Sequence, residues 1–169
     1  MQQVLVPSKC ARILEENKGL INALSKKLKC EIKIEDGNQI RIEGEAYDEY
    51  NAKNVLSAFG RGFDIDTAYA LLSDECFFTS INLKEIFKSE DQIKRIKGRI
   101  IGKEGKSKTY IEAVSGARLC VYGNTVSLIG SMDEIKVADT ALQILLDGGT
   151  HKKAYRIMER VKRSLTNNG

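Results

Sequence analysis

A glycine- and lysine-rich stretch, GRIIGKEGKSKTYIEAVSGA at residues 98–117, carries the residue types best suited to binding phosphate. Gly102 and Gly105 lie between two segments with helical apolar spacing, and glycine allows a sharp turn and a close approach to a ligand. The amides that open the second helix supply the positive end of a helix dipole, which favours an anion. Three lysines add mobile charge: Lys103, Lys106 and Lys108. An ordinary connector between two helices is the alternative.

The distribution of charge favours an anionic ligand for the second half of the chain. Residues 1–74 contain 10 Lys/Arg and 12 Asp/Glu, a net charge of −2, whereas residues 75–169 contain 17 and 11, a net charge of +6. Between residues 94 and 108, seven bases accompany a single acid, Glu104. Such a cluster is a candidate surface for nucleic acid, although charge runs are also common on solvated faces.

A nucleotide-binding P-loop does not explain the EGKS segment. A P-loop needs a further glycine five positions before the glycine that precedes the lysine, and Ile100 occupies that position. The preceding segment also has a helical pattern, whereas a P-loop follows a strand.

Catalytic and metal-binding residue sets are missing from the sequence. The single histidine, His151, has no accompanying ligand set, and no CxxC pair occurs. The four cysteines are expected to be reduced residues of the core: Cys10, Cys30, Cys76 and Cys120. We therefore expect no enzymatic activity, no metal and no cofactor. The chain has no apolar run of 18 residues and no signal peptide, so we expect a cytoplasmic protein without a membrane span.

An internal repeat of 86 residues organises the chain. Four glycines recur at this offset: Gly19, Gly37, Gly44 and Gly62 correspond to Gly105, Gly123, Gly130 and Gly148. Apolar positions agree as well, since Ile40 matches Val126 and Leu56 matches Leu142. The repeat indicates two copies of one fold.

Each copy has the pattern strand–helix–helix–strand–strand–helix. The first copy begins with a strand in QVLVP and continues with helices near residues 8–16 and 20–30. The second begins with a strand in CFFTSINL and continues with helices near residues 90–101 and 106–115. A tight turn containing Gly-Asn joins the last two strands of each copy. The prediction is an α+β fold with domains at 1–74 and 75–149.

Residues 150–169 form a third predicted part, a basic amphipathic helix with a short tail. An apolar stripe runs along this helix through Ala154, Met158 and Leu165. Its basic face carries four residues that are candidate accessory contacts to RNA: Lys152, Arg156, Arg160 and Arg163.

The second copy resembles the KH domain of RNA-binding proteins. Its segment IIGKEGKSKTYIEAVSGARL has the two aliphatic residues, the GxxG loop, an aliphatic residue at Ile111 and the Ser115-Gly116 pair of that family. Lys108 departs from the pattern, because many KH domains have an aliphatic residue there. The resemblance implies two tandem type I KH domains, of which the second clamps single-stranded RNA.

The resemblance also implies which residues bind RNA. The set is Arg99, Ile100, Ile101, Gly102, Lys103, Glu104, Gly105, Lys106, Ser107, Lys108, Ile111, Arg118 and Leu119. Ile100, Ile101 and Ile111 are expected to form the apolar floor of a groove for the bases. Arg118 and Leu119 are expected on its strand side. In the first copy, Glu16 aligns with Gly102 and follows Glu15, so this copy is expected to lack the phosphate clamp.

Two KH domains, the first without GxxG, joined through AFGRGFDIDTAYALL, are similar to the partner-of-Nob-one family, also called the Dim-two family. These are ribosome-assembly factors of archaea and eukaryotes. The chain starts almost directly at its first KH strand, without the long N-terminal extension of eukaryotic members, and is therefore expected to be archaeal.

The resemblance implies a non-enzymatic factor that binds near the 3′ end of the small-subunit rRNA and assists its maturation. Implied protein partners are the PIN-domain rRNA endonuclease and the alpha subunit of translation initiation factor two. The alternative is a protein-interaction scaffold that binds a nuclease or a translation factor, with RNA binding secondary.

Overall fold

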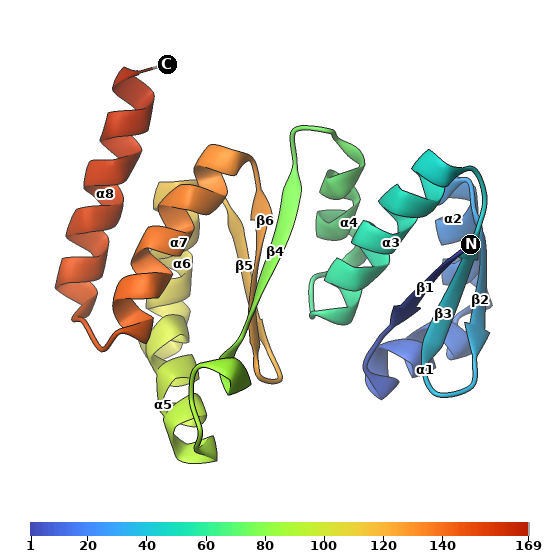
Figure 1. The fold of residues 1–169 in the computed structure, drawn as a ribbon, viewed down its shortest axis with the longest axis horizontal. Coiled ribbons are helices and arrows are strands. Elements are labelled where there is room, and N and C mark those ends of the chain that lie inside the picture. The colour runs from blue at the N-terminus through green and yellow to red at the C-terminus, as the bar shows by residue number, and fades with distance from the viewer. Residues whose placement is uncertain (169) are drawn as a thin grey trace. The chain divides into compact units, whose positions relative to one another are not determined.

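The chain folds into two compact units, Met1–Leu72 and Ser73–Gly169. The computed structural model describes residues 1–168, so Gly169 at the end of the predicted tail lies outside the described residues. Each unit combines helices with a small antiparallel sheet (Figure 1), which confirms the α+β class. No helix in residues 1–168 is long and apolar enough to cross a membrane.

The first unit packs its helices on a three-stranded sheet with the strand order β1-β3-β2. Its elements are β1 (Gln2–Leu5), α1 (Ser8–Glu16), α2 (Lys18–Leu28), β2 (Glu31–Glu35), β3 (Gln39–Glu43), α3 (Ala46–Gly60), α4 (Ile65–Ala68) and a 3₁₀ turn at Tyr69–Leu72. The central strand, β3, places Ile40 and Ile42 in the core, where both are fully buried.

The second unit has the same strand order, β4-β6-β5, and the same antiparallel pairing. Its elements are β4 (Phe77–Asn82), a 3₁₀ turn (Leu83–Glu85), α5 (Glu90–Ile101), a 3₁₀ turn (Lys103–Gly105), α6 (Lys106–Ser115), β5 (Arg118–Tyr122), β6 (Thr125–Gly130), α7 (Met132–Leu146) and α8 (His151–Asn167). Capping boxes at Ser89 and Ser131 fix where α5 and α7 begin. The helices bury one face of the sheet through Leu119, Val126 and Leu128.

Two of the four glycine pairs at the 86-residue offset have positive φ in both units. Gly37 and Gly123 both have positive φ, at 77° and 55°, in the turn that joins the last two strands of each sheet. The asparagine after each of these glycines also forms an equivalent hydrogen bond. The carbonyl of Asn38 accepts from Val6 N at 3.1 Å, and the carbonyl of Asn124 accepts from Leu83 N at 2.8 Å. The repeat seen in the sequence is thus a repeat of backbone structure.

The third helix of each unit ends in the same hydrogen-bonded motif. Gly62 follows α3 with φ 95° and Gly148 follows α7 with φ 87°. At the end of α3, the N–H groups of Gly62 and Phe63 donate to carbonyls within the last turn, at 3.1 and 3.3 Å. This is a Schellman motif, so the GRGF segment ends a helix at a glycine with positive φ.

The pair Gly19 and Gly105 differs between the two units. Gly19 lies inside α2, whereas Gly105 has φ 74° and stands at the N-cap of α6. The predicted range 20–30 for α2 was therefore wrong by two residues at each end. Asn17 starts the helix earlier because its side chain accepts from Leu20 N at 3.0 Å. Lys29 ends it earlier because it adopts the left-handed conformation.

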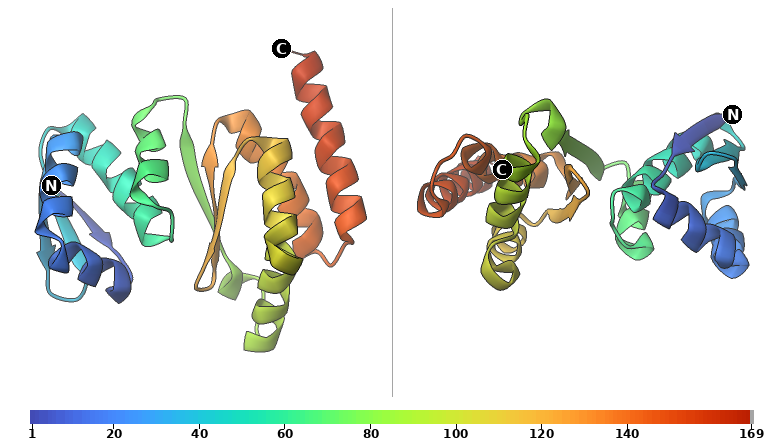
Figure 2. Two further views of the ribbon diagram at one scale, coloured as in Figure 1. Left: turned by 180° about the vertical axis from the view of Figure 1, so that it is seen from behind. Right: turned by 90° about the horizontal axis from the view of Figure 1, so that it is seen from below.

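The C-terminal helix α8 belongs to the core of the second unit. Ala154 and Met158 are fully buried and contribute to the same hydrophobic cluster as α5, α6 and α7. The two further views in Figure 2 show α8 lying alongside α7. Its cap is Thr150, whose hydroxyl accepts from Lys153 N at 3.1 Å.

Candidate nucleic-acid interface

The loop between α5 and α6 has a backbone that only glycine can adopt at its first position. Gly102 has φ 76° and ψ 173°, and a Cβ atom there would lie 2.7 Å from the Cβ of Ser107. Glu104 and Gly105 also have positive φ, at 56° and 74°. A Cβ atom on Gly105 would meet nothing within 4 Å, so the loop is packed against α6 on one side and open on the other.

The N-terminus of α6 is left without a side-chain cap. Within the described part of the second unit, α5, α7 and α8 each begin with a serine or threonine whose side chain accepts a first-turn N–H. Gly105, the N-cap of α6, has no side chain to do this. The N–H of Lys106 donates to the carbonyl of Lys103, whereas the first-turn donors after it have no side-chain acceptor and lie at the positive end of a ten-residue helix.

Lys103 and Lys106 flank this helix end as unpaired cations. Both side chains are exposed, and neither forms an ion pair within residues 1–168. The predicted third lysine, Lys108, differs, because its Nζ lies 3.7 Å from Oε1 of Glu112.

Glu112 is a residue that the sequence reasoning missed. Its other oxygen, Oε2, lies 3.3 Å from Nε of Arg118 and 3.4 Å from the backbone nitrogen of Leu119. This carboxylate therefore connects α6 to β5 and partly neutralises Lys108 and Arg118. The four-residue spacing from Lys108 was a detectable signal, whereas the contact with β5 required the fold.

Three of the residues predicted to line a groove lie in the core. Ile100 and Ile111 have no exposed surface, and Leu119 is 2% exposed. In this structure these side chains hold α5, α6 and β5 together below the loop and have no surface to offer a base. Ile101, next to the loop, is half-buried.

Ser107 lies beneath the loop in the first turn of α6. Its side chain is buried at 2% exposure, and its hydroxyl has no hydrogen-bond partner among the described residues. The close approach of Gly102 covers this residue, and an unpartnered buried hydroxyl lowers stability.

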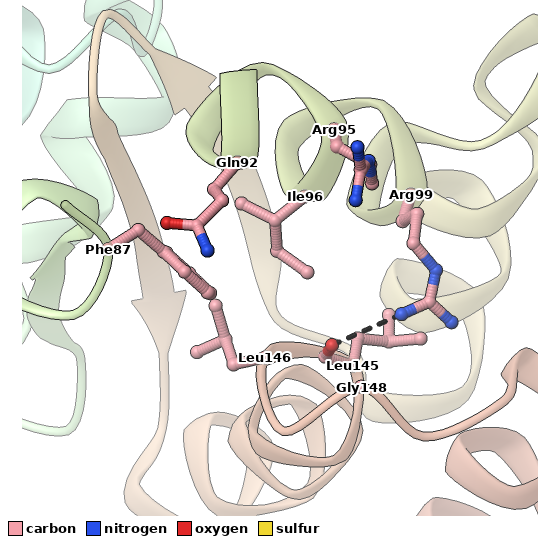
Figure 3. A pocket seen from close by; sticks show the side chains of 8 residues that line it. All are labelled: Phe87, Gln92, Arg95, Ile96, Arg99, Leu145, Leu146 and Gly148. Atoms are coloured by element: carbon pink, nitrogen blue, oxygen red, sulfur yellow. Dashed lines mark hydrogen bonds between the residues drawn. The ribbon is translucent and has the colours of Figure 1, made fainter. Parts of the chain in front are cut away.

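Arg99 points away from the loop, toward the end of α7. Its guanidinium donates to the carbonyl of Leu145 at 3.3 Å (Figure 3). It also donates to the carbonyl of Gly149. The Arg99 carbonyl in turn lies 2.7 Å from Nε2 of His151. A cation at the C-terminus of a helix is favourable, and this position gives Arg99 a structural role in joining α5, α7 and α8.

Arg99 also lines a pocket of about 180 Å³ on this side of the second unit. The lining residues, drawn in Figure 3, are Phe87, Gln92, Arg95, Ile96, Arg99, Leu145, Leu146 and Gly148. The pocket is built from Phe87, α5 and the end of α7, and the residues of the glycine loop do not line it.

The four accessory candidates all lie on the exposed side of α8. Their side chains are solvent-accessible, and none of them forms an ion pair within the described chain: Lys152, Arg156, Arg160 and Arg163.

The corresponding junction of the first unit has no loop. α1 ends at Glu16 and α2 begins at Lys18, so Asn17 alone connects them. Asn17 itself caps α2, which occupies the first-turn donor that α6 leaves open.

A glycine loop that joins two helices, followed by a β-hairpin and a third helix on one sheet, is the arrangement of a KH domain, a nucleic-acid-binding fold. The family model for the second KH domain of PNO1, described as a eukaryotic-type KH domain (KH domain type I), matches residues 77–163. The chain belongs to this PNO1/Dim2 family of KH-domain proteins.

Relatives and solved structures agree with this assignment. A KH domain-containing protein of Methanocaldococcus jannaschii is 34% identical over 166 residues, covering 95% of this chain and 73% of the relative. The pre-rRNA-processing protein PNO1 of Chaetomium thermophilum is 35% identical over 105 residues, covering 60% of this chain and 40% of that protein. A chain in the crystal structure of an a/eIF2alpha–aDim2p–rRNA complex from Pyrococcus horikoshii is 32% identical, with a TM-score of 0.87 over 96% of this chain and 94% of that chain.

The matched family is one of KH-domain proteins and not a class of enzymes. Within residues 1–168, no group of three or more His, Cys, Asp or Glu side chains is arranged to hold a metal ion.

Proposed function

We propose that this chain is a ribosome-assembly factor that binds single-stranded RNA through the second of two tandem type I KH domains. The observation that carries the proposal is the uncapped N-terminus of α6, beside two exposed and unpaired lysines, Lys103 and Lys106. Backbone donors, a helix dipole and mobile cations at one place form a phosphate clamp. The first domain lacks this clamp, since Asn17 fills the equivalent place.

The proposed contact surface is narrower than the set of residues that the sequence indicates. Direct contacts come from the loop and the exposed start of α6, with Ile101 beside them: Gly102, Lys103, Glu104, Gly105 and Lys106. Lys108 and Arg118 border the site, where Glu112 restrains both. The bases would lie between α6 and β5, where KH domains hold about four nucleotides.

The RNA we propose is the region near the 3′ end of the small-subunit rRNA. Support comes from the similar proteins, one a pre-rRNA-processing protein and one solved in a complex with rRNA. Within this role the chain would be a non-enzymatic helper of the PIN-domain endonuclease. Crosslinking to total cellular RNA, with mapping of the sites, tests the target. Sites throughout messenger RNA would contradict it.

A second candidate is a protein-interaction scaffold. One observation favours it, because the solved complex that contains a similar chain also contains a/eIF2alpha. In this case RNA affinity would be secondary, and the loss of the loop lysines would leave binding to the factor's alpha subunit unchanged.

The test of RNA binding compares the two helix junctions within one molecule. Replacing Lys103 and Glu104 by Asp keeps both glycines but puts two carboxylates at the phosphate site. We expect at least a tenfold loss of affinity for single-stranded RNA, about 1.4 kcal/mol or more, with little change in melting temperature.

The control is Asn17→Asp with Lys18→Asp in the first unit. Aspartate preserves the cap of α2, so the fold is retained although more negative charge is introduced. We expect affinity to stay within twofold, or about 0.4 kcal/mol. Equal losses from the two double variants would show that both domains hold RNA, and the assignment of the first as clampless would be wrong.

A further inference from the structure

Contacts with α5 and α6 fix the rotation of helix α8 about its own axis. At its first residue, Nε2 of His151 lies 2.7 Å from the carbonyl oxygen of Arg99. Further along, the rings of Tyr155 and Tyr110 lie with their centroids 4.5 Å apart, and the Tyr110 hydroxyl donates to the carboxylate of Glu159. The buried stripe on the other side of α8 completes the attachment.

These contacts place the start of α8 near the glycine loop. Arg99 is in the last turn of α5, three residues before Gly102. Arg99, which precedes the loop, contacts His151 at the start of α8, and Tyr110, which follows the loop, contacts Tyr155 and Glu159 further along α8. Helices α6 and α8 therefore both begin near the loop and run alongside each other.

The exposed face of α8 is a continuous basic stripe. Four bases follow one another at intervals of four, four and three residues, which puts them on one side of a helix: Lys152, Arg156, Arg160 and Arg163. The only acid in residues 151–168 is Glu159, and Tyr110 already binds it. The stripe is about 16 Å long at 1.5 Å per residue.

We propose that this stripe is a second phosphate-binding surface for the same RNA strand that the loop clamps, so that nucleotides beyond the clamped ones continue along α8. The inference rests on the proposed function of the loop. Cations at regular intervals along one helix face suit the sugar–phosphate backbone of RNA, because each can neutralise a phosphate. The Tyr110–Glu159 bond keeps the acid turned toward α6 and leaves the bases to the RNA.

The test uses pools of random single-stranded RNA of two lengths, four and twelve nucleotides, with the full chain. The triple variant Arg156→Gln, Arg160→Gln, Arg163→Gln is expected to lose at least fivefold in affinity for the longer pool. Its slope of log K against log salt should become shallower by about 2, at roughly 0.7 per lost contact. Affinity for the shorter pool should stay within twofold, because four nucleotides only fill the clamp.

The matched control removes the same charge from exposed lysines on other elements that form no ion pair within residues 1–168, by Lys9→Gln, Lys26→Gln and Lys84→Gln. This control should bind both pools as the parent chain does. Equal effects of the α8 variant on both lengths, or a loss on the longer pool no greater than that of the control, would overturn the proposal. Failure of the proposed function is distinguishable, because it would show as normal binding of both pools by the Lys103→Asp, Glu104→Asp variant.

Discussion

Gly102 and Ser107 approach so closely that a Cβ atom on Gly102 would lie 2.7 Å from the Cβ of Ser107 and 2.8 Å from its backbone nitrogen. The loop thus folds back onto the first turn of the helix whose amides it exposes. The same contact buries the Ser107 side chain and fixes the distance between the loop and α6. The two glycines of the motif consequently have different tasks.

Alanine at the two loop glycines should therefore have unequal effects on stability. Gly102→Ala combines a backbone conformation reserved for glycine with a steric clash, and we expect it to lower the free energy of unfolding by about 3 kcal/mol. Gly105→Ala meets open space and requires only a left-handed alanine, a cost of about 1 kcal/mol. Urea denaturation of both variants measures the difference, and equal costs would contradict this account of the loop.

Two buried serines in α6 should respond in opposite ways to replacement by alanine. The Ser115 hydroxyl donates to Ile111 O at 2.6 Å and accepts from Ala117 N at 3.1 Å, so Ser115→Ala should cost about 1–3 kcal/mol. Ser107→Ala removes a hydroxyl without a partner among the described residues and should leave stability unchanged or raised by up to about 1 kcal/mol. A large loss in Ser107→Ala, measured by thermal unfolding, would reveal a hydrogen bond at this hydroxyl.

Two arginines on α5 should contribute unequally to the stability of the fold. Arg99→Met removes the hydrogen bonds to the carbonyls of Leu145 and Gly149, and we expect a loss of about 1–3 kcal/mol. Arg95→Met removes an exposed arginine from the same helix and should change stability by less than about 0.5 kcal/mol. Similar unfolding midpoints for the two variants would show that the hydrogen bonds of the Arg99 guanidinium contribute nothing to stability.

The contact between α6 and α8 should weaken at alkaline pH. The hydrogen bond to Glu159, followed by burial, raises the pKa of the Tyr110 phenol above its ordinary value. A raised pKa means that the folded state favours the neutral phenol, so the stabilisation is complete below the unfolded pKa of about 10 and is lost as pH rises through the folded pKa.

The measurement compares the parent chain with Tyr110→Phe, which cannot make this bond. We expect the parent to be the more stable by a constant amount up to about pH 9.5 and by a shrinking amount above about pH 10. The check is urea unfolding at a series of pH values. A difference that persists unchanged to about pH 11 would mean that the phenol does not donate this bond.

Much of the fold was predictable because its signals are local. The observed bounds of α1, α5 and α6 agree with the ranges 8–16, 90–101 and 106–115 that apolar spacing, caps and glycines indicate. The glycine loop was equally visible, because two glycines three residues apart between helical segments indicate a sharp turn of the backbone. Each of these signals depends on neighbours within one or two helical turns.

Only the tertiary structure determines where the side chains around the loop lie and which groups they contact. Ile100 and Ile111 have the same apolar character whether they line a groove or a core, and the packing of α5 and α6 on the sheet puts them in the core. Arg99 finds its acceptors 46 and 50 residues along the chain, at a helix end whose position no local pattern reports. The sequence suggested that the Arg99 side chain was available to RNA, whereas in the fold it donates to carbonyl groups, because the last acceptors of a helix lack partners within the helix.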